Sequence, residues 1–70
     1  MIEQVPRTRF RIMQGNEMHW HGGDSPHAEL DARARATQIS AASKMPVLLH
    51  RYRGGEVKLI ARYVGGKPAL

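Results

Sequence analysis

Cysteine is absent from the 70-residue sequence, which excludes disulfide bonds, a thiol nucleophile and thiolate metal sites. Long hydrophobic runs are absent too. No stretch approaches the roughly 18 apolar residues of a membrane helix, and residues 1–10 lack the apolar region of a signal peptide. Acidic residues are few: six Asp and Glu stand against eleven Lys and Arg, so the formal net charge is +5. We therefore expect a soluble, cytoplasmic, basic protein with no membrane association.

The length of the chain predicts one small domain, residues 1–70. Residues 1–6 should form a loose N-terminal arm. Residues 65–70 should form a flexible tail, because two glycines and a proline disfavour regular structure there. A domain of this size has a marginal core of its own, and small cysteine-free chains often depend on close packing or on oligomerisation.

Residues 7–21 predict a β-hairpin, because Phe10 and Ile12 alternate with polar residues and Gly15-Asn16 favours a turn. A two-residue loop would pair Ile12 with His19 and mix polar and apolar side chains on each face. A three-residue loop would pair Ile12 with Trp20, and we prefer it. The expected core face then carries Phe10, Ile12, Met18 and Trp20. The opposite face carries Arg9, Arg11, Met13, His19 and His21.

An alanine-rich helix is predicted from Pro26 to Lys44, with Asp24 or Ser25 as its cap. At about 100° per residue its apolar residues fall on two stripes. The first stripe, which should lie on the sheet, contains Ala28, Ala32, Ala36, Ile39 and Ala42. The second contains Leu30, Ala34, Ala41 and Met45. This second stripe is either solvated or packed against another chain.

Residues 47–53 and 56–64 predict a second hairpin around Gly54-Gly55. That loop pairs Arg51 with Lys58 and His50 with Leu59. The expected helix-facing side carries Leu48, His50, Tyr52, Val57, Leu59, Ala61 and Tyr63. The other side carries Val47, Leu49, Ile60 and Val64 together with the charged residues. The predicted fold is α+β, a single antiparallel sheet with one helix packed across it in the order ββαββ, or βαββ if the first hairpin frays.

A basic surface is the leading candidate for function. By strand parity one face of the second hairpin carries Arg51, Arg53, Lys58 and Arg62, and Arg9 and Arg11 would extend it if the hairpins share a sheet with these faces aligned. Like charges across a strand pair repel, so the Arg51–Lys58 pair suits either a solvated surface or a bound anion. Stacking of single-stranded nucleic acid is not favoured, because Tyr52 and Tyr63 fall on the expected core face.

The histidines offer a weaker candidate, a metal site. His19 and His21 would point to the same side of a strand, and Asp24 or His27 could supply a third ligand. Exposed histidines beside a glycine-rich turn are the simpler interpretation, and we expect no metal. His50 lacks an oriented acid or base partner, and no phosphate-loop pattern is present, so we expect neither catalysis nor a cofactor.

Residues 32–42, the run Met45-Pro46-Val47-Leu48-Leu49 and residues 51–57 carry a resemblance. With its alanine-rich helix, proline-led strand and Gly-Gly hairpin, the chain resembles small βαββ proteins carried by phages, prophages and plasmids. The resemblance implies a binding role without enzyme activity. Some proteins of this kind, including anti-CRISPR proteins, attach to a host complex. The basic charge departs from that of acidic DNA mimics.

Two functions remain open at this point. The first is a small basic binding module whose partner is an anionic macromolecule, either nucleic acid or an acidic surface of a protein complex. The second is a homodimeric structural or interaction protein whose charge serves solubility. A dimer is expected because Val47, Leu49, Ile60 and Val64 would otherwise lack cover.

Overall fold

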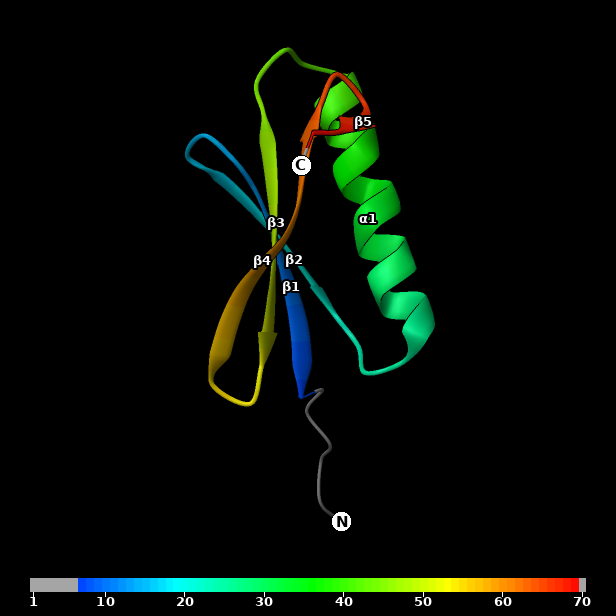
Figure 1. Cartoon of the computed structure of the whole chain (residues 1–70), viewed down its shortest axis with the longest axis vertical. Helices are drawn as coiled ribbons and strands as arrows, with labels where there is room; N and C mark the ends of the chain where they lie inside the picture. Colours follow the sequence, from blue (N-terminus) through cyan, green and yellow to red (C-terminus); the bar gives the residue numbers. More distant parts are fainter. Residues whose placement is uncertain (1–6, 70) are drawn as a thin grey trace.

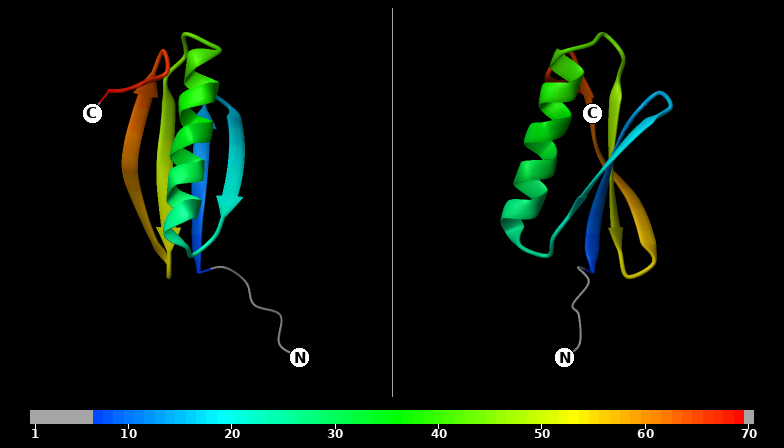
Figure 2. Two further views of the ribbon diagram at one scale, coloured as in Figure 1. Left: turned by 90° about the vertical axis from the view of Figure 1, so that its right-hand side faces the viewer. Right: turned by 180° about the vertical axis from the view of Figure 1, so that it is seen from behind.

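The computed structural model describes residues 7–69. The helix α1 packs across one face of a five-stranded antiparallel sheet whose strand order is β2-β1-β3-β4-β5 (Figures 1 and 2). The elements are β1 (Thr8–Gln14), β2 (Glu17–Gly22), α1 (Pro26–Ala41), β3 (Val47–Arg53), β4 (Glu56–Val64) and β5 (Lys67–Pro68). The α+β class and the single helix across an antiparallel sheet are confirmed. The order is ββαβββ, so one strand more than predicted follows the helix.

The first hairpin closes through the two-residue loop Gly15-Asn16, so the preferred three-residue loop is wrong. Ile12 pairs with His19, and Met13 pairs with Met18. Gly15 adopts φ 60°, the left-handed conformation that a tight hairpin turn requires. Because one residue of register exchanges the faces, Trp20 and Met18 lie on the face opposite Phe10 and Ile12.

The second hairpin follows the predicted register from Arg53–Glu56 to His50–Leu59 and then departs from it. A β-bulge at Ile60 makes Leu49 pair with Ala61 and Leu48 with Arg62. The helix covers the face that carries Val47, Leu49, Ala61 and Tyr63, all of them buried. The expected core face of this hairpin is therefore wrong: Leu48, His50, Tyr52, Val57 and Leu59 point away from α1.

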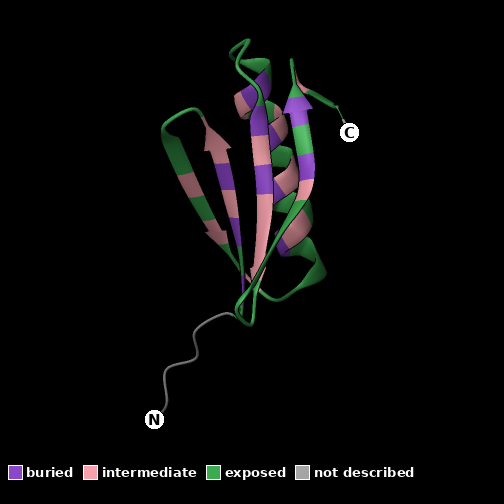
Figure 3. Ribbon diagram, turned by 60° about the vertical axis from the view of Figure 1, so that its left-hand side comes forward, coloured by how far each residue is buried: buried purple, intermediate pink, exposed green. Residues whose placement is uncertain are grey.

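The core lies between α1 and this face of the sheet. Ala28, Ala32 and Ala36 are buried on the helix, and they meet the sheet residues Phe10, Ile12, Val47, Leu49, Ala61 and Tyr63. The alternation of buried with more exposed positions along β1 and β3 is visible in Figure 3. The first predicted helix stripe is confirmed except for Ala42, which is exposed. The residues of the second stripe, Leu30, Ala34, Ala41 and Met45, are all exposed.

The helix ends at Ala41, three residues before the predicted end, and Lys44 lies beyond it. The expected flexible tail is ordered from Gly65 to Ala69: it turns at Gly65-Gly66 and adds β5 to the edge of β4. The buried Ser40 hydroxyl fastens this turn to the helix, because it accepts the Gly66 N–H at 2.9 Å and donates to the Thr37 carbonyl at 3.0 Å. The predicted N-terminal arm lies outside the described residues.

Candidate functional site

The sheet presents one face to α1 and the other to solvent, which we call the open face. Pairing across the ladders places on it Arg9, Arg11, Met13, Met18, Trp20, Leu48, His50, Tyr52, Val57, Leu59, Arg62, Val64 and Lys67. Five of these are large hydrophobic residues with 39–52% of their surface exposed. Among residues 7–69, no Asp or Glu of a strand has its side chain on the open face.

Two rings and two guanidinium groups form a continuous cluster near the centre of the open face. Trp20 on β2 and Tyr52 on β3 come from the strands that flank β1, and their ring centroids lie 5.2 Å apart at an interplanar angle of 58°. Arg9 on β1 lies over the Trp20 ring at 4.7 Å, and Arg11 lies over the Tyr52 ring at 5.1 Å. We call these four residues the aromatic–arginine cluster.

The stacking has an electrostatic consequence. A guanidinium that rests on an aromatic face is held by the ring quadrupole, while its N–H groups project from its edge. No carboxylate is recorded within salt-bridge distance of Arg9 or Arg11 in the described part of the chain. Their charge and donors are therefore not used in internal ion pairs.

His50 lies beside this cluster, directly across from Arg11 in the β1–β3 ladder. The His50 Nδ1 and the Arg11 Nε are both buried and have no hydrogen-bond partner within the described structure. Burial lowers the pKa of His50 below its ordinary value of 6.5, and the Arg11 charge lowers it further. His50 is accordingly neutral near pH 7 and adds no charge to the face.

The six predicted basic residues do not share one surface. Arg9, Arg11 and Arg62 lie on the open face, whereas Arg51, Arg53 and Lys58 lie on the helix side at the tip of the second hairpin. The bulge at Ile60 causes the separation within β4, because it reverses the parity between Lys58 and Arg62. The first hairpin does share the sheet, but Arg9 pairs with Tyr52 rather than with a basic residue.

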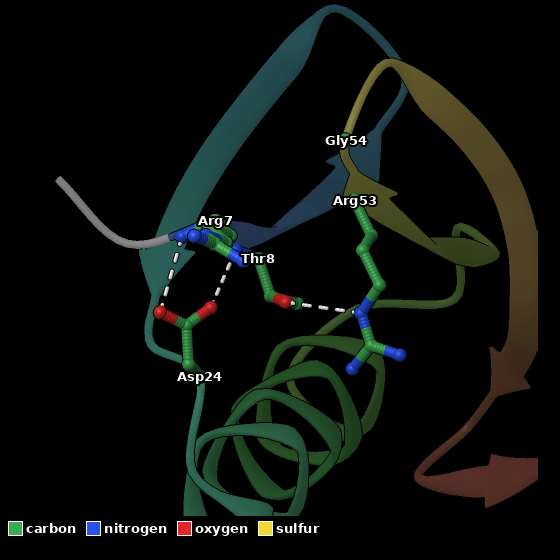
Figure 4. Close-up of a pocket in the computed structure, with 5 residues that line it drawn as sticks. All are labelled: Arg7, Thr8, Asp24, Arg53 and Gly54. Atoms are coloured by element: carbon green, nitrogen blue, oxygen red, sulfur yellow. Dashed lines mark hydrogen bonds between the residues drawn. The ribbon is translucent and has the colours of Figure 1, made fainter.

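The basic residues on the helix side have polar or acidic neighbours. Arg51 Nη1 lies 3.8 Å from Glu29 Oε1. Arg53 pairs across the turn with Glu56, and its Nε donates to Thr8 Oγ1 at 3.2 Å (Figure 4). The predicted Arg51–Lys58 pair is confirmed, but Glu29 relieves its repulsion.

A shallow hollow of about 650 Å³ lies beside Arg53, lined also by Arg7, Thr8, Asp24 and Gly54 (Figure 4). The Asp24 carboxylate there accepts the backbone N–H of Arg7 at 3.1 Å and of Thr8 at 2.8 Å. These bonds, the one from Arg7 foremost, lower the pKa of Asp24 although desolvation opposes them. Asp24 thus ties the start of β1 to the loop before α1, and the hollow is mixed in charge.

The histidines lie elsewhere than predicted. The two-residue loop turns His19 and His21 to the helix side, away from Arg9 and Arg11, and His27 lies on α1. His19 Nε2 lies 4.0 Å from Glu17 Oε2. Among residues 7–69 no three His, Asp or Glu side chains group closely enough to hold a metal ion. No helix in this part of the chain is long and apolar enough to cross a membrane.

Comparisons with known proteins found no match: no family model, no curated protein and no solved structure is significantly similar to this chain. The site therefore rests on the geometry alone.

Sequence reasoning missed Trp20 and Tyr52 as surface residues, because it assigned both to the core. The signal that could have found them is the register of the two-residue loop. That register puts Trp20 on the same face as Arg9 and Arg11, which mixes polar and apolar residues on that face but allows Arg9 to stack on the indole.

Proposed function

We propose that the protein is a non-enzymatic nucleic-acid-binding module whose contact surface is the open face. One observation carries the proposal. The open face combines three arginines with the exposed Trp20 ring, the half-buried Tyr52 ring beside it and, at the described strand positions, no carboxylate. A phosphate backbone offers the matching charge, and nucleobases offer the matching planar surfaces.

The arginines suit phosphate better than a surface lysine would. Arg9 and Arg11 are held in place by the rings beneath them, so their N–H groups are oriented before a ligand arrives. A planar guanidinium can donate two parallel hydrogen bonds to a phosphate. Preorganisation reduces the entropy lost on binding, because fewer side-chain rotamers must be fixed.

Charge argues against a homodimer formed through the open face. Two such faces packed together would bring six arginines into one interface without a carboxylate from the strands to offset them. Buried unpaired charge is costly. The original motive for a dimer is also weaker, because Val47 and Leu49 are fully buried beneath the chain's own helix.

Fluorescence anisotropy with labelled RNA and DNA oligonucleotides, at low and moderate salt, tests the proposal. Neutralising Arg9 and Arg11 together to Gln should weaken binding strongly. Neutralising Arg51 and Lys58 together to Gln removes the same charge from the helix side and should weaken binding much less. Wild-type affinity should fall steeply as salt rises, because bound phosphates release counterions.

Three results would overturn the proposal. One is the absence of binding to any oligonucleotide at low salt. Another is equal loss of affinity in the two double variants, which would indicate only a general charge effect. The third is a dimer in light scattering that dissociates when Trp20 is replaced by Ala, since the open face would then be an interface between two copies. If the protein binds an acidic protein through Arg9 and Arg11 and binds no oligonucleotide, the open face is a protein-binding surface.

A further inference from the structure

We infer that the open face takes an unpaired strand, with successive bases stacked on Trp20 and Tyr52, rather than a duplex. This inference rests on the proposed function and narrows its ligand class. It is carried by the relation between the two rings and by the apolar surface around them.

The rings do not match the spacing of bases in a duplex. Stacked bases are parallel and about 3.4 Å apart along one strand. The Trp20 and Tyr52 rings are 5.2 Å apart and inclined by 58°. Bases stacked on both rings must therefore separate and turn relative to each other. A single strand can do this because its bases can be splayed out, whereas a duplex holds its bases stacked and paired.

The exposed area of the Trp20 ring supports the same ligand. Trp20 has 47% of its surface exposed even though Arg9 lies over its ring. The indole thus retains accessible area in the presence of its arginine. Stacking on such a ring is tolerant of base identity, because every base has a π face.

Apolar residues surround the cluster on the open face. On β4, Val57 pairs with Tyr52 and Leu59 pairs with His50. On β2, Met18 lies two residues from Trp20 and points to the same side. All three have 43–52% of their surface exposed. A duplex presents phosphates and only the edges of its bases, which offer these residues little apolar surface. The bases of an unpaired strand offer their whole faces.

The distance between the outer arginines sets the length of strand. Arg9 is on β1 and Arg62 is on β4, two strands away. Along the strand direction they are four residues apart, because Arg62 is level with Met13. With about 4.8 Å between neighbouring strands and about 6.7 Å for every two residues along a strand, they are about 16 Å apart. That is about five nucleotides at the 3.4 Å spacing of a stacked strand, and fewer if the strand is extended.

The first measurement compares a labelled single strand of about ten nucleotides with a duplex of the same sequence. The single strand should bind more tightly. Affinity should rise with length up to about five nucleotides and change little beyond that. Because Trp20 is the protein's one tryptophan, its intrinsic fluorescence reports directly on stacking, and single strands should quench it.

The decisive variants are Trp20→Ala and Met18→Ala. Both residues are on β2, point to the open face and are similarly exposed, 47% and 46%. Trp20→Ala should weaken single-strand binding about 5- to 150-fold, and Trp20→Phe should restore most of it. Met18→Ala should weaken it much less than Trp20→Ala does, because it removes an apolar contact but no ring on which a base can stack. Tyr52→Leu is a second stacking variant should Trp20→Ala fail to fold, and circular dichroism checks folding in each case.

The outcomes separate the inference from the proposed function. Equal affinity for duplex and single strand, with no quenching of Trp20, would overturn the inference while nucleic-acid binding stands. The same conclusion would follow if Trp20→Ala and Met18→Ala had equal effects. Absence of binding to every oligonucleotide would overturn the proposed function and the inference with it.

Discussion

Lys58 and Arg62 provide the sharpest comparison of the two faces of the sheet. Both are exposed cations on β4, four residues apart, so a regular strand would point them to the same side. The bulge at Ile60 turns them to opposite sides, Lys58 toward the helix side and Arg62 toward the open face. Replacing each with Gln removes one charge from one face and leaves the other face intact.

The expected size follows from the charges on the open face. If Arg9, Arg11 and Arg62 each neutralise one phosphate of a single strand, the slope of log affinity against log salt concentration should be about −2, because each contact contributes about −0.7. Arg62→Gln should reduce the magnitude of that slope by about 0.7. Lys58→Gln should leave the slope nearly unchanged. The Debye length at physiological salt is only about 8 Å, and the sheet lies between Lys58 and the bound nucleic acid.

The assay is a titration of a labelled single strand at four or more salt concentrations for the wild type and both variants. Thermal unfolding is the control. The free energy of unfolding should change by less than about 1 kcal/mol in each variant, because exposed charges contribute little to stability. Equal reductions of the slope in Arg62→Gln and Lys58→Gln would refute the assignment of the contact surface to the open face.

Three further predictions concern stability. Ser40→Ala should lower the free energy of unfolding by about 1–3 kcal/mol in urea titrations, because it leaves the Gly66 N–H without its acceptor. Ala32→Leu should cost about 1–3 kcal/mol by overpacking a fully buried contact, and an unchanged melting temperature would place Ala32 outside the core. Burial and Arg11 hold the pKa of His50 below its ordinary 6.5, so the unfolded chain takes up the proton first as pH falls. The stability that neutral His50 contributes should be present above about pH 6.5 and be lost as pH falls toward the folded pKa, and His50→Gln should abolish this dependence.

Local signals in the sequence predict most of the elements. The period-two runs, the Gly-Gly turn and the alanine-rich segment locate four strands and the helix close to their observed bounds. The fifth strand escapes prediction because Lys67–Pro68 is two residues long, and because the turn before it is held at Gly66 by a residue distant in sequence, Ser40 near the end of α1. The helix ends earlier than the sequence predicts, because nothing in the local sequence marks Ala41 as the last helical residue.

The faces of the strands are harder to predict than the strands. In the first hairpin, the choice between a two-residue and a three-residue loop decides the side to which every β2 side chain points. The three-residue loop separates polar from apolar residues better, but the chain adopts the two-residue loop. In the second hairpin one extra residue at Ile60 moves Arg62 to the opposite side from Lys58. The candidate site was missed for this reason, since it depends on which residues share a face and not on which residues are present.

The position of Trp20 is the strongest argument that the open face has a function. Aromatic side chains bury about 150–250 Å² each and dominate the energetics of small cores. This chain has one Trp, one Phe and two Tyr. Phe10 and Tyr63 are buried, whereas Trp20 is 47% exposed and Tyr52 lies beside it on the same face. A 70-residue domain without disulfides gains little stability from an indole left half in water. Departures from the local rules of folding concentrate at functional sites. Here that departure coincides with three arginines that no strand carboxylate on the same face opposes, and both features match the bases and phosphates of one unpaired strand.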